Sequence, residues 1–545
     1  MSQPRGDNPS ASTGPWHPLR ISIFRNLLIA NLVSDVGAFM QSVGAAWLMT
    51  SLSSSPLYIA LIQTASALPF FLLALPAGSI GDIVDRRRLI LVTEIWMFAV
   101  ASVLTAATFA GWMTPWLLLV LTLAVSLGDA IEAPTWRAIF PELVDKQDLT
   151  PALALNGIEF NMARAVGPGL GGLIVAAAGV GIAFLMNALS FFGVIFVIAG
   201  WKRPVRRSSL PPETLTGASL AGIRYVRYSP GIRTLLLRSA CVMFFASSFW
   251  ALLPTVGKEL SKSPLGYGFL LGFFGTGAVL GAVVLQHARS ALSVETLLSS
   301  ATALFGAIVL STATLHNLIV LCLLMLFGGA AWTVFMSLFN MTVQSLAPEW
   351  VRARVLAAYL FVFQGSVAVG SALWGIVAAH TSVRLALLIC SIGIGGSLLL
   401  RIPFRLPNTS VDLRAWNHWG KPSMFQEPAP ELGPVLVTIR YVIDPAKAAE
   451  FLDEIYRYER VRRRDGATRW GIFYDTEVPH VYLESFLVDS WAEHQRQHQR
   501  FTVADRELEQ RVLSYTLQPT QVTHYIHAKR GRRHRPEKIS SSRAT

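Results

Sequence analysis

The dominant feature of this 545-residue chain is a series of long apolar segments separated by short breaks rich in glycine, proline and charge. A helix needs about 20 mostly apolar residues to cross a bilayer, and we count twelve segments of that kind. Only 14% of the residues are charged, against about 25% in soluble domains. We therefore predict an all-α membrane protein with spans at residues 24–50, 56–80, 89–110, 115–138, 153–178, 181–201, 234–256, 264–288, 294–315, 317–345, 354–379 and 382–400.

The distribution of basic residues predicts the orientation of these spans. The chain has 46 Lys and Arg against 33 Asp and Glu, a net charge of +13, and most basic residues lie before the first span or after even-numbered spans. Cytoplasmic loops carry such an excess, so we expect both termini to be cytoplasmic and the protein to lie in the inner (plasma) membrane. Topology then accounts for the charge, and no nucleic-acid partner is expected.

The three cysteines lie within apolar segments and predict no disulfide framework. They are Cys241, Cys322 and Cys390. We expect no metal site and no cofactor.

Short motifs recur at a nearly constant offset along the chain. Ser55-Pro56-Leu57 returns as Ser263-Pro264-Leu265, and Pro141-Glu142 returns as Pro348-Glu349. This repetition predicts two six-helix halves that enclose a central cavity and expose it alternately to each side. The expected organisation is a tail at 1–20, a first bundle at 21–201, a cytoplasmic linker at 202–232 and a second bundle at 233–405.

The loop after the second span carries a motif of glycine, aspartate and arginine. Gly78, Asp82, Arg86 and Arg87 match the loop signature of the major facilitator superfamily, which this chain resembles, although Ile83 and Asp85 depart from the pattern. The resemblance implies that Asp82 holds the two halves together on the cytoplasmic side, by contacting the eleventh span and an arginine of the fourth span. The arginine at that place is Arg137.

The fifth span contains Gly167-Pro168, followed by Gly171 and Gly172. This resembles the end of the antiporter signature of the same superfamily, and the resemblance implies export. Proline weakens a helix and small residues let helices approach closely. We expect a tight seam with the eighth span, whose small residues are Gly272, Gly275, Gly277 and Gly281; plain helix packing is the alternative interpretation.

The segment 140–168 is similar to the branch that contains the enterobactin exporter and the transmembrane secretion effectors. This resemblance implies a proton-coupled secondary transporter that exports small organic molecules of drug or siderophore type, rather than an enzyme. Two alternatives stay open: an importer of a small solute, and a membrane-anchored enzyme or sensor acting through the C-terminal tail.

Charged residues inside the spans need a reason, because a charge at the bilayer centre costs about 2.5–3.5 kcal/mol on insertion scales. Asp35 and Arg164 lie near the middle of their spans, and Asp129 and Glu132 lie in the inner half of the fourth. We interpret these four as proton-coupling candidates, with a fixed Asp35–Arg164 ion pair as the alternative. Glu94 and Glu159 are expected nearer helix ends, where they extend toward the membrane surface or pair. The candidates for the substrate cavity are Trp47, Asn161, Asn340 and Gln364.

The composition becomes polar after a second linker at 406–430. Strands are expected at 434–443, 467–475, 480–488 and 521–527, with helices at 445–464 and 490–515. This order predicts a cytoplasmic ferredoxin-like α+β domain at 431–528, followed by a basic tail at 529–545. It resembles the dimeric α+β barrel group, which implies a homodimer through this domain. His494 and His498 share one helical face, without a third metal ligand nearby.

Overall fold

The computed structural model describes residues 14–73, 84–145, 147–201, 215–406, 412–416 and 428–528, without the side chains of 215–219. The chain forms two compact units. The membrane unit comprises Met1–Ser219, Gly231–Ser345 and Ala353–Asn408. The C-terminal unit comprises Leu220–Pro230, Leu346–Arg352 and Thr409–Thr545.

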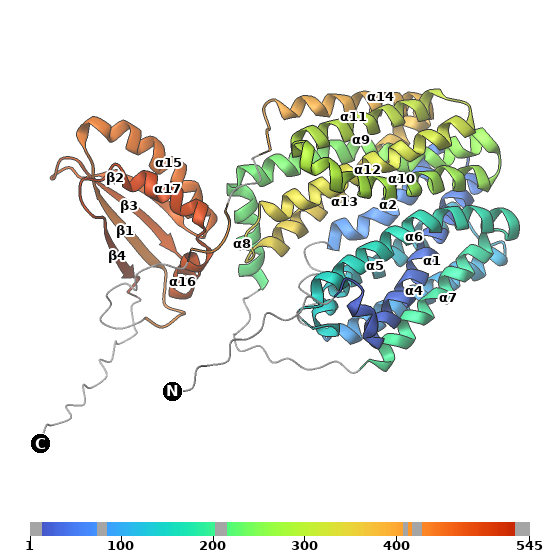
Figure 1. Ribbon diagram of the computed structural model, residues 1–545, viewed down its shortest axis with the longest axis horizontal. Helices are drawn as coiled ribbons and strands as arrows, with labels where there is room; N and C mark the ends of the chain where they lie inside the picture. Colours follow the sequence, from blue (N-terminus) through green and yellow to red (C-terminus); the bar gives the residue numbers. More distant parts are fainter. Residues whose placement is uncertain are drawn as a thin grey trace, which may run out of the picture. The chain divides into compact units, whose positions relative to one another are not determined.

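The described part of the membrane unit contains twelve long helices, which confirms the fold predicted from the apolar segments (Figure 1). The first half follows a short 3-10 turn, η1 (His17–Arg20), and contains α1 (Ser22–Leu52), α2 (Pro56–Leu73), α4 (Arg86–Phe109), α5 (Pro115–Leu143), α6 (Leu149–Ala178) and α7 (Val180–Gly200). The second half contains α9 (Pro230–Ser261), α10 (Pro264–Ala291), α11 (Val294–Thr314), α12 (Leu318–Ser345), α13 (Arg352–His380) and α14 (Val383–Ser397), which continues as η2 (Leu398–Arg401).

Eleven spans in the described residues are long and apolar enough to cross a membrane. The long helix missing from this set is α6, which carries Glu159, Asn161 and Arg164. Because of these polar residues, α6 alone among the twelve long described helices falls short of the hydropathy of a membrane span. We therefore expect contacts with other helices to hold α6 in the bundle.

Caps and prolines fix where several of these helices begin. The Ser263 hydroxyl accepts a hydrogen bond from the Leu265 amide, and Pro264 is the first residue of α10. Pro56 likewise begins α2 after Ser55. A capping hydroxyl followed by proline favours a helix start, so the repeated Ser-Pro motif starts one helix in each half.

The predicted linker between the halves is partly helical in its described portion. Helix α8 (Leu215–Tyr228) ends two residues before α9 begins at Pro230. The segment Leu220–Pro230 belongs to the C-terminal unit rather than to the membrane unit.

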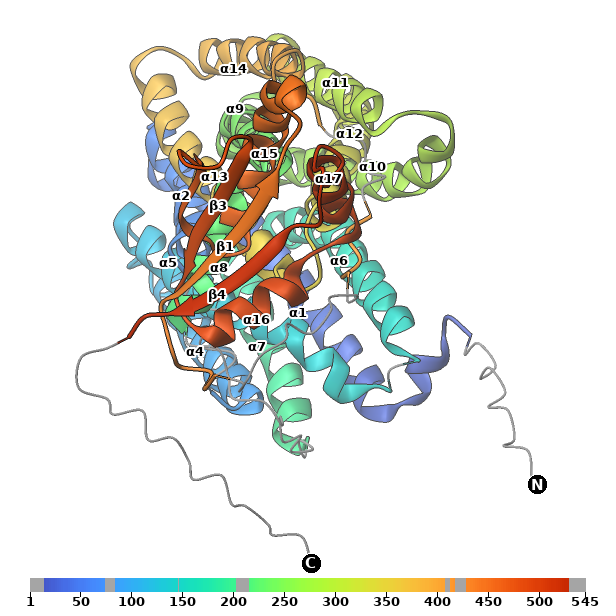
Figure 2. The ribbon, with the colours of Figure 1, turned by 90° about the vertical axis from the view of Figure 1, so that its left-hand side faces the viewer.

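The C-terminal unit contains the four-stranded antiparallel sheet expected of a ferredoxin-like domain. Its strands are β1 (Val435–Val442), β2 (Thr468–Tyr474), β3 (Val481–Val488) and β4 (Gln521–Ile526), in the order β2-β3-β1-β4. Figure 2 shows β1 between β3 and β4. The helical elements are η3 (Pro445–Lys447), α15 (Ala448–Arg464), α16 (Trp491–Arg500) and α17 (Val503–Leu513).

The single helix predicted at 490–515 is wrong, because the structure divides it into α16 and α17. Phe501 has an extended backbone, with φ −68° and ψ 131°. The Thr502 hydroxyl accepts from the Asp505 amide, and the Asp505 carboxylate accepts from the Thr502 amide. This reciprocal capping starts a new helix.

Alternation along β1 places the core of this domain on one face of the sheet. Val435, Val437, Ile439 and Tyr441 are buried and share a core with Phe451 and other apolar residues of α15 and α17. Successive strand residues point to opposite faces, so the intervening β1 residues lie on the other face.

Candidate transport site

The cytoplasmic-loop motif is only partly within the described residues. Gly78 and Asp82 lie outside them, so the predicted contact between Asp82 and Arg137 does as well. Arg137 itself is exposed on α5.

The two arginines of this motif join the ends of three helices. Arg86 donates to the Ala138 carbonyl and the Glu142 carboxylate of α5, both at 2.8 Å. Arg87 donates to the carbonyls of Ile198 and Ala199 at 3.0 and 2.6 Å. The last carbonyls of a helix lack partners within it and attract cations. Arg87 therefore caps the end of α7, and Arg86 fixes α4 against α5.

Asp35 lies in a polar contact between α1 and α6. The Asn31 amide donates to the Asp35 carboxylate at 3.3 Å and to the Glu159 carboxylate at 3.0 Å. The Asp35 and Glu159 carboxyls also lie within hydrogen-bonding distance of each other. Glu159 is only 3% exposed, whereas Asp35 is half-buried, so the pair is buried at its α6 side and partly accessible at its α1 side.

A second pair of carboxyls joins α4 to α5. The Glu132 carboxylate accepts a hydrogen bond from the Thr93 hydroxyl at 2.5 Å and lies within hydrogen-bonding distance of Glu94. Glu94 and Glu132 are 4% and 7% exposed. Two carboxyls can share a hydrogen bond only when one of them holds a proton. Each of the two pairs is therefore a place where a proton can reside.

The acidic groups of the first half also interact through space. The charge of Asp35 interacts with those of Glu94, Asp129 and Glu132. The side chain of Asp129 is exposed on α5 and does not belong to either buried pair. The acidic residues of the first half therefore lie near one another on α1, α4, α5 and α6, and only three of them, Asp35, Asp129 and Glu132, were predicted from the sequence.

Arg164 is not the partner of Asp35. Its guanidinium lies over the ring of Trp332, 5.9 Å from the centroid, and in the part of the chain that the structure describes it forms no ion pair with Asp35. This cation–π contact connects α6 of the first half with α12 of the second. The alternative of a fixed Asp35–Arg164 ion pair therefore has no counterpart in this structure.

The sequence predicts that Glu94 and Glu159, nearer the helix ends, either extend toward the membrane surface or pair, and the structure shows them paired. Both are buried inside the bundle and pair with the two acidic residues, Glu132 and Asp35, that the sequence did single out. Asn31 was missed altogether. The available signal was its spacing of four residues before Asp35, which places both side chains on one face of α1.

The glycines of the fifth span pack against two different helices. A Cβ atom on Gly167 would lie 2.7 Å from the Phe39 Cβ, and one on Gly171 would lie 2.9 Å from the Met40 Cα. These two positions therefore face α1. A Cβ on Gly172 would lie 2.5 Å from the Gly268 Cα of α10. Pro168 is buried in the same segment.

The predicted small-residue seam is correct for part of the eighth span. A Cβ on Gly275 would lie 2.6 Å from the Ala165 Cα, and Gly272 faces Gly169. Gly277 and Gly281 instead face Leu326 and Ala330 of α12. The seam between α6 and α10 thus joins the halves, whereas the later glycines pack α10 within its own half.

Two hydrogen bonds add to the contact between the halves. Thr64 of α2 donates its hydroxyl to the Ala368 carbonyl of α13 at 3.1 Å. Lys258 of α9 donates to the Thr50 carbonyl of α1.

The candidates for the substrate cavity occupy different environments. Trp47 is buried, at 9% exposure, whereas Asn161, Asn340 and Gln364 are partly exposed. Asn161 donates to the Gly157 carbonyl of its own helix, and Asn340 accepts from Gln344 one turn later. The partly exposed amides therefore remain candidates, and Trp47 acts mainly in packing.

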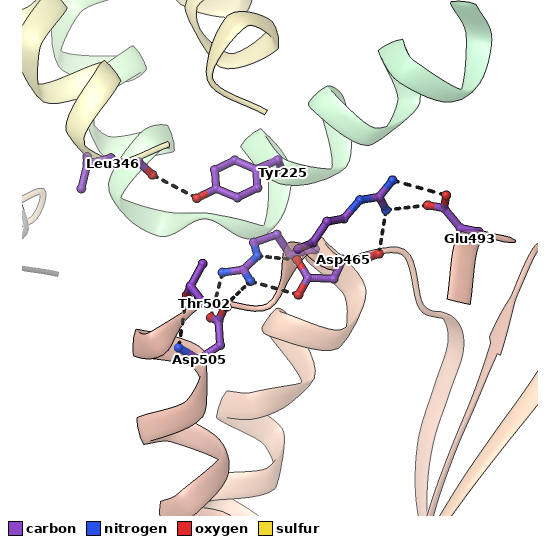
Figure 3. Close-up of polar contacts among 8 residues, drawn as sticks. Tyr225, Leu346, Asp465, Glu493, Thr502 and Asp505 are labelled. Carbon is purple, nitrogen blue, oxygen red and sulfur yellow. Dashed lines mark hydrogen bonds and ion pairs between the residues drawn. The ribbon is translucent and has the colours of Figure 1, made fainter. Parts of the chain in front are cut away.

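The C-terminal unit also contains two segments from distant parts of the chain, Leu220–Pro230 and Leu346–Arg352, and Figure 3 shows Tyr225 of the first beside Leu346 of the second. Arg224 at the end of α8 pairs with Glu493 of α16 at 3.3 Å. Arg500 pairs with the same Glu493 at 2.6 Å and stacks over Trp350, 4.7 Å from its ring centroid. Tyr225 donates its hydroxyl to the Leu346 carbonyl at 3.0 Å. The domain thereby binds both the linker helix and the loop between α12 and α13.

A second ion-pair group supports this contact from within the domain. Arg464 pairs with Asp465 at 2.9 Å and with Asp505 at 2.7 Å, and lies over the Tyr225 ring, 5.4 Å from its centroid. These side chains, also drawn in Figure 3, are largely buried. We refer to Arg224, Tyr225, Leu346, Trp350, Arg464, Glu493 and Arg500 as the clamp.

A model of one protein family, described as transmembrane secretion effector, matches residues 13–532. The chain belongs to the transmembrane secretion effector family. This family assignment agrees with the one predicted from segment 140–168, and it makes the chain a secondary transporter and a multi-pass membrane protein that handles a small-molecule substrate.

Curated relatives are transporters as well. The staphyloferrin A transporter of Staphylococcus aureus is 24% identical over 63% of this chain and 86% of that protein. The multidrug efflux pump Tap of Mycolicibacterium fortuitum is 26% identical over 61% of this transporter and 83% of that protein.

Solved structures support the fold. A single-residue mutant of the nucleoside transporter NupG matches with a TM-score of 0.60 at 11% identity, over 70% of this chain and all of that chain. A bacterial homologue of the lysosomal transporter Spinster matches with a TM-score of 0.57 at 13% identity, over 71% of this chain and 98% of that chain.

Proposed function

We propose that this transporter exports small organic molecules in exchange for protons across the bacterial inner membrane. The observation that carries the proposal is the carboxyl pair of the half-buried Asp35 and the buried Glu159, both of which accept hydrogen bonds from Asn31 between α1 and α6. Such a pair holds one proton readily, while a second negative charge is opposed by the first.

Movement of the halves supplies a way to load and release that proton. Helix α6 carries Glu159 on one side and packs through Gly172 against α10 of the other half. When the halves rock, water reaches the Asp35–Glu159 pair first from one side of the membrane and then from the other. A proton that moves through 100 mV provides about 2.3 kcal/mol, enough for roughly fortyfold accumulation of substrate.

Two observations support export as the direction. Gly167, Pro168, Gly171 and Gly172 follow the antiporter-type pattern and form close contacts with α1 and α10. Relatives of this chain include proteins named as efflux pumps, among them Tap and the macrolide efflux protein A of Streptococcus pyogenes. We infer a substrate of the drug or siderophore type.

A reconstituted system tests coupling and direction together. A growth-inhibition panel with deletion and overexpression strains first selects the compound, beginning with a macrolide. Purified transporter in liposomes is then given that compound and an inward or outward pH gradient. We expect wild type to accumulate the compound in the direction opposite to proton flow. Asp35→Asn and Glu159→Gln should lose this gradient-driven accumulation.

The matched control is Glu259→Gln, which removes a half-exposed carboxylate near the end of α9. It should accumulate the compound as wild type does. Full accumulation by Asp35→Asn would contradict the coupling role, and accumulation in the same direction as proton flow would identify an importer.

We also propose that both termini are cytoplasmic and that the α+β domain pairs with a second copy. Leu436, Leu487 and Tyr525 lie in register across β1, β3 and β4, on the face opposite the domain core. Tyr525 is 54% exposed. Native mass spectrometry of the full transporter should show a dimer that Tyr525→Arg weakens; a monomeric wild type would contradict this pairing.

A further inference from the structure

The α+β domain has an open cavity of about 620 Å³ between its sheet and its helices. All lining residues belong to this domain, from Val437 of β1 to His524 of β4. Protein cores normally leave few voids larger than a water molecule, whereas sites for small organic molecules measure about 300–1,000 Å³. The cavity therefore has the size of a ligand site.

Three histidines converge on this cavity from two elements. His494 and His498 lie one turn apart on α16, and their Nε2 atoms are 3.2 Å from each other. His524 comes from β4, and its ring centroid lies 4.7 Å from that of His494. The register between β1 and β4 pairs His524 with Val437 of the core face. The imidazole of His524 therefore lies on the same side of the sheet as His494 and His498.

These imidazoles are uncharged at neutral pH. Burial lowers the pKa of His494 to about 3 and that of His498 to about 4, and it also lowers the pKa of His524. A neutral imidazole has one donor and one acceptor nitrogen. The cluster can therefore donate and accept hydrogen bonds without adding charge to the cavity.

The charged side chains that line the cavity already have partners. Arg462 pairs with Glu484 at 3.1 Å, and Arg506 pairs with Glu509. Asp465 pairs with Arg464. A charged ligand would have to break one of these pairs or remain buried without a counter-ion, and both are costly. The lining thus selects against ions.

The remaining walls are apolar and partly aromatic. Phe486 and Ile439 line the sheet side, and Phe501 and Val512 line the helix side. Flat apolar surfaces favour aromatic rings, which stack at centroid separations of about 4.5–7 Å. Among the described residues no group of three His, Cys, Asp or Glu is arranged to hold a metal ion, so the histidines are best matched by an organic ligand.

We propose that this cavity binds an uncharged aromatic molecule that carries hydroxyl or carbonyl groups, with His494, His498 and His524 as its polar contacts. The site makes the α+β domain a ligand-binding domain in its own right, in addition to the transport site of the helices. Helix α16 carries His494 and His498 as well as the clamp residues Glu493 and Arg500. A ligand in the cavity would therefore contact the same helix that binds the linker and the α12–α13 loop.

The test uses the full transporter in lipid nanodiscs and equilibrium dialysis with two uncharged probes, 2-naphthol and menadione. Their charged counterpart is 2-naphthalenesulfonate. Empty nanodiscs give the contribution of the lipid. We expect saturable binding of at least one uncharged probe, with one site per chain, and at least tenfold weaker binding of the sulfonate.

Two variants assign the binding to this cavity. His498→Phe removes the polar contact and keeps a ring, and Val522→Trp fills the space from β4; each should weaken binding at least tenfold. His527→Phe is the matched control, because His527 is exposed and follows the same strand without lining the cavity. It should bind within twofold of wild type, and thermal melting identifies any variant that fails to fold.

Four outcomes would overturn the proposal, three of them from the probe measurements. These three are the absence of saturable binding of both uncharged probes to folded wild type, binding that both cavity variants leave unchanged, and equal affinity for 2-naphthol and its sulfonate. Stoichiometric binding of Zn²⁺ that depends on all three histidines would also replace the organic ligand by a metal.

Discussion

The guanidinium of Arg500 lies over the indole of Trp350, 4.7 Å from its centroid, and joins the α+β domain to the loop between α12 and α13. The same arginine is 4% exposed and pairs with Glu493. A cation stacked on an aromatic ring and paired with a carboxylate has several favourable contacts at once. The domain is thus attached to the connections of the membrane helices by specific side chains as well as by the chain itself.

Arg500→Ala should release the clamp. Removing one partner of a buried ion pair typically costs about 3–5 kcal/mol, because Glu493 keeps its charge and loses its closest cation. We expect faster hydrogen–deuterium exchange in residues 220–230 and 346–352, measured by mass spectrometry. Arg511→Ala, at an exposed position of α17, should leave exchange in both segments unchanged; equal protection in the two variants would show that Arg500 does not hold them.

Gly172→Ala should separate α6 from α10. The added methyl would lie 2.5 Å from the Gly268 Cα, and backbone atoms cannot move aside as a side chain can. Overpacking typically costs about 1–3 kcal/mol, so the thermal melting temperature and the transport rate should both fall. Gly157→Ala is the control, because no atom lies within 4 Å of its Cβ position, and it should melt at or above the wild-type temperature.

Thr93→Val should weaken the Glu94–Glu132 pair without changing the volume of the side chain greatly. The hydroxyl donates to Glu132 at 2.5 Å in a buried site, and loss of such a donor costs about 1–3 kcal/mol. We expect a lower melting temperature and a transport rate with altered pH dependence. Thr314→Val, at an exposed position near the end of α11, should change neither quantity.

The α+β domain should lose stability as the pH falls below about 6.5. In the unfolded chain His494 and His498 titrate near 6.5, whereas burial lowers their pKa in the folded domain to about 3 and about 4. Between these values the unfolded state binds more protons, so acid favours unfolding. Between pH 7 and pH 5 each histidine should remove about 2 kcal/mol of stability.

Hydrogen exchange of the sheet amides at several pH values measures this effect in the full transporter. His498→Phe should reduce the acid dependence, since one of the two groups is absent. Exchange that is independent of pH, after correction for the intrinsic rate, would contradict the prediction.

The predicted helices agree closely with the observed ones because length and hydropathy determine them locally. A run of apolar residues of bilayer length has few alternatives to a helix, and the Ser-Pro motifs fixed the starts of α2 and α10. The strand predicted at 434–443 likewise corresponds to β1 (Val435–Val442). The break at Phe501 was missed because Thr502 and Asp505 cap a helix inside a segment that is otherwise continuously helical in pattern.

The candidate sites were predictable only in part, because long-range contacts decide them. Asp35 was identified from its position in a span, but its partner Glu159 lies 124 residues away and was assigned to a helix end. His494 and His498 were recognised from their spacing, whereas His524 reaches them through the register of β1 with β4. Neither contact leaves a periodic signal in the sequence.

The close approach of Gly172 and Gly268 has a consequence for how fast the two halves can move. Where two main chains touch without intervening side chains, no rotamers must be exchanged when one helix rolls on the other. We therefore expect this contact to resist rolling little, and polar contacts between the halves, such as that between Lys258 and the Thr50 carbonyl, to resist it more.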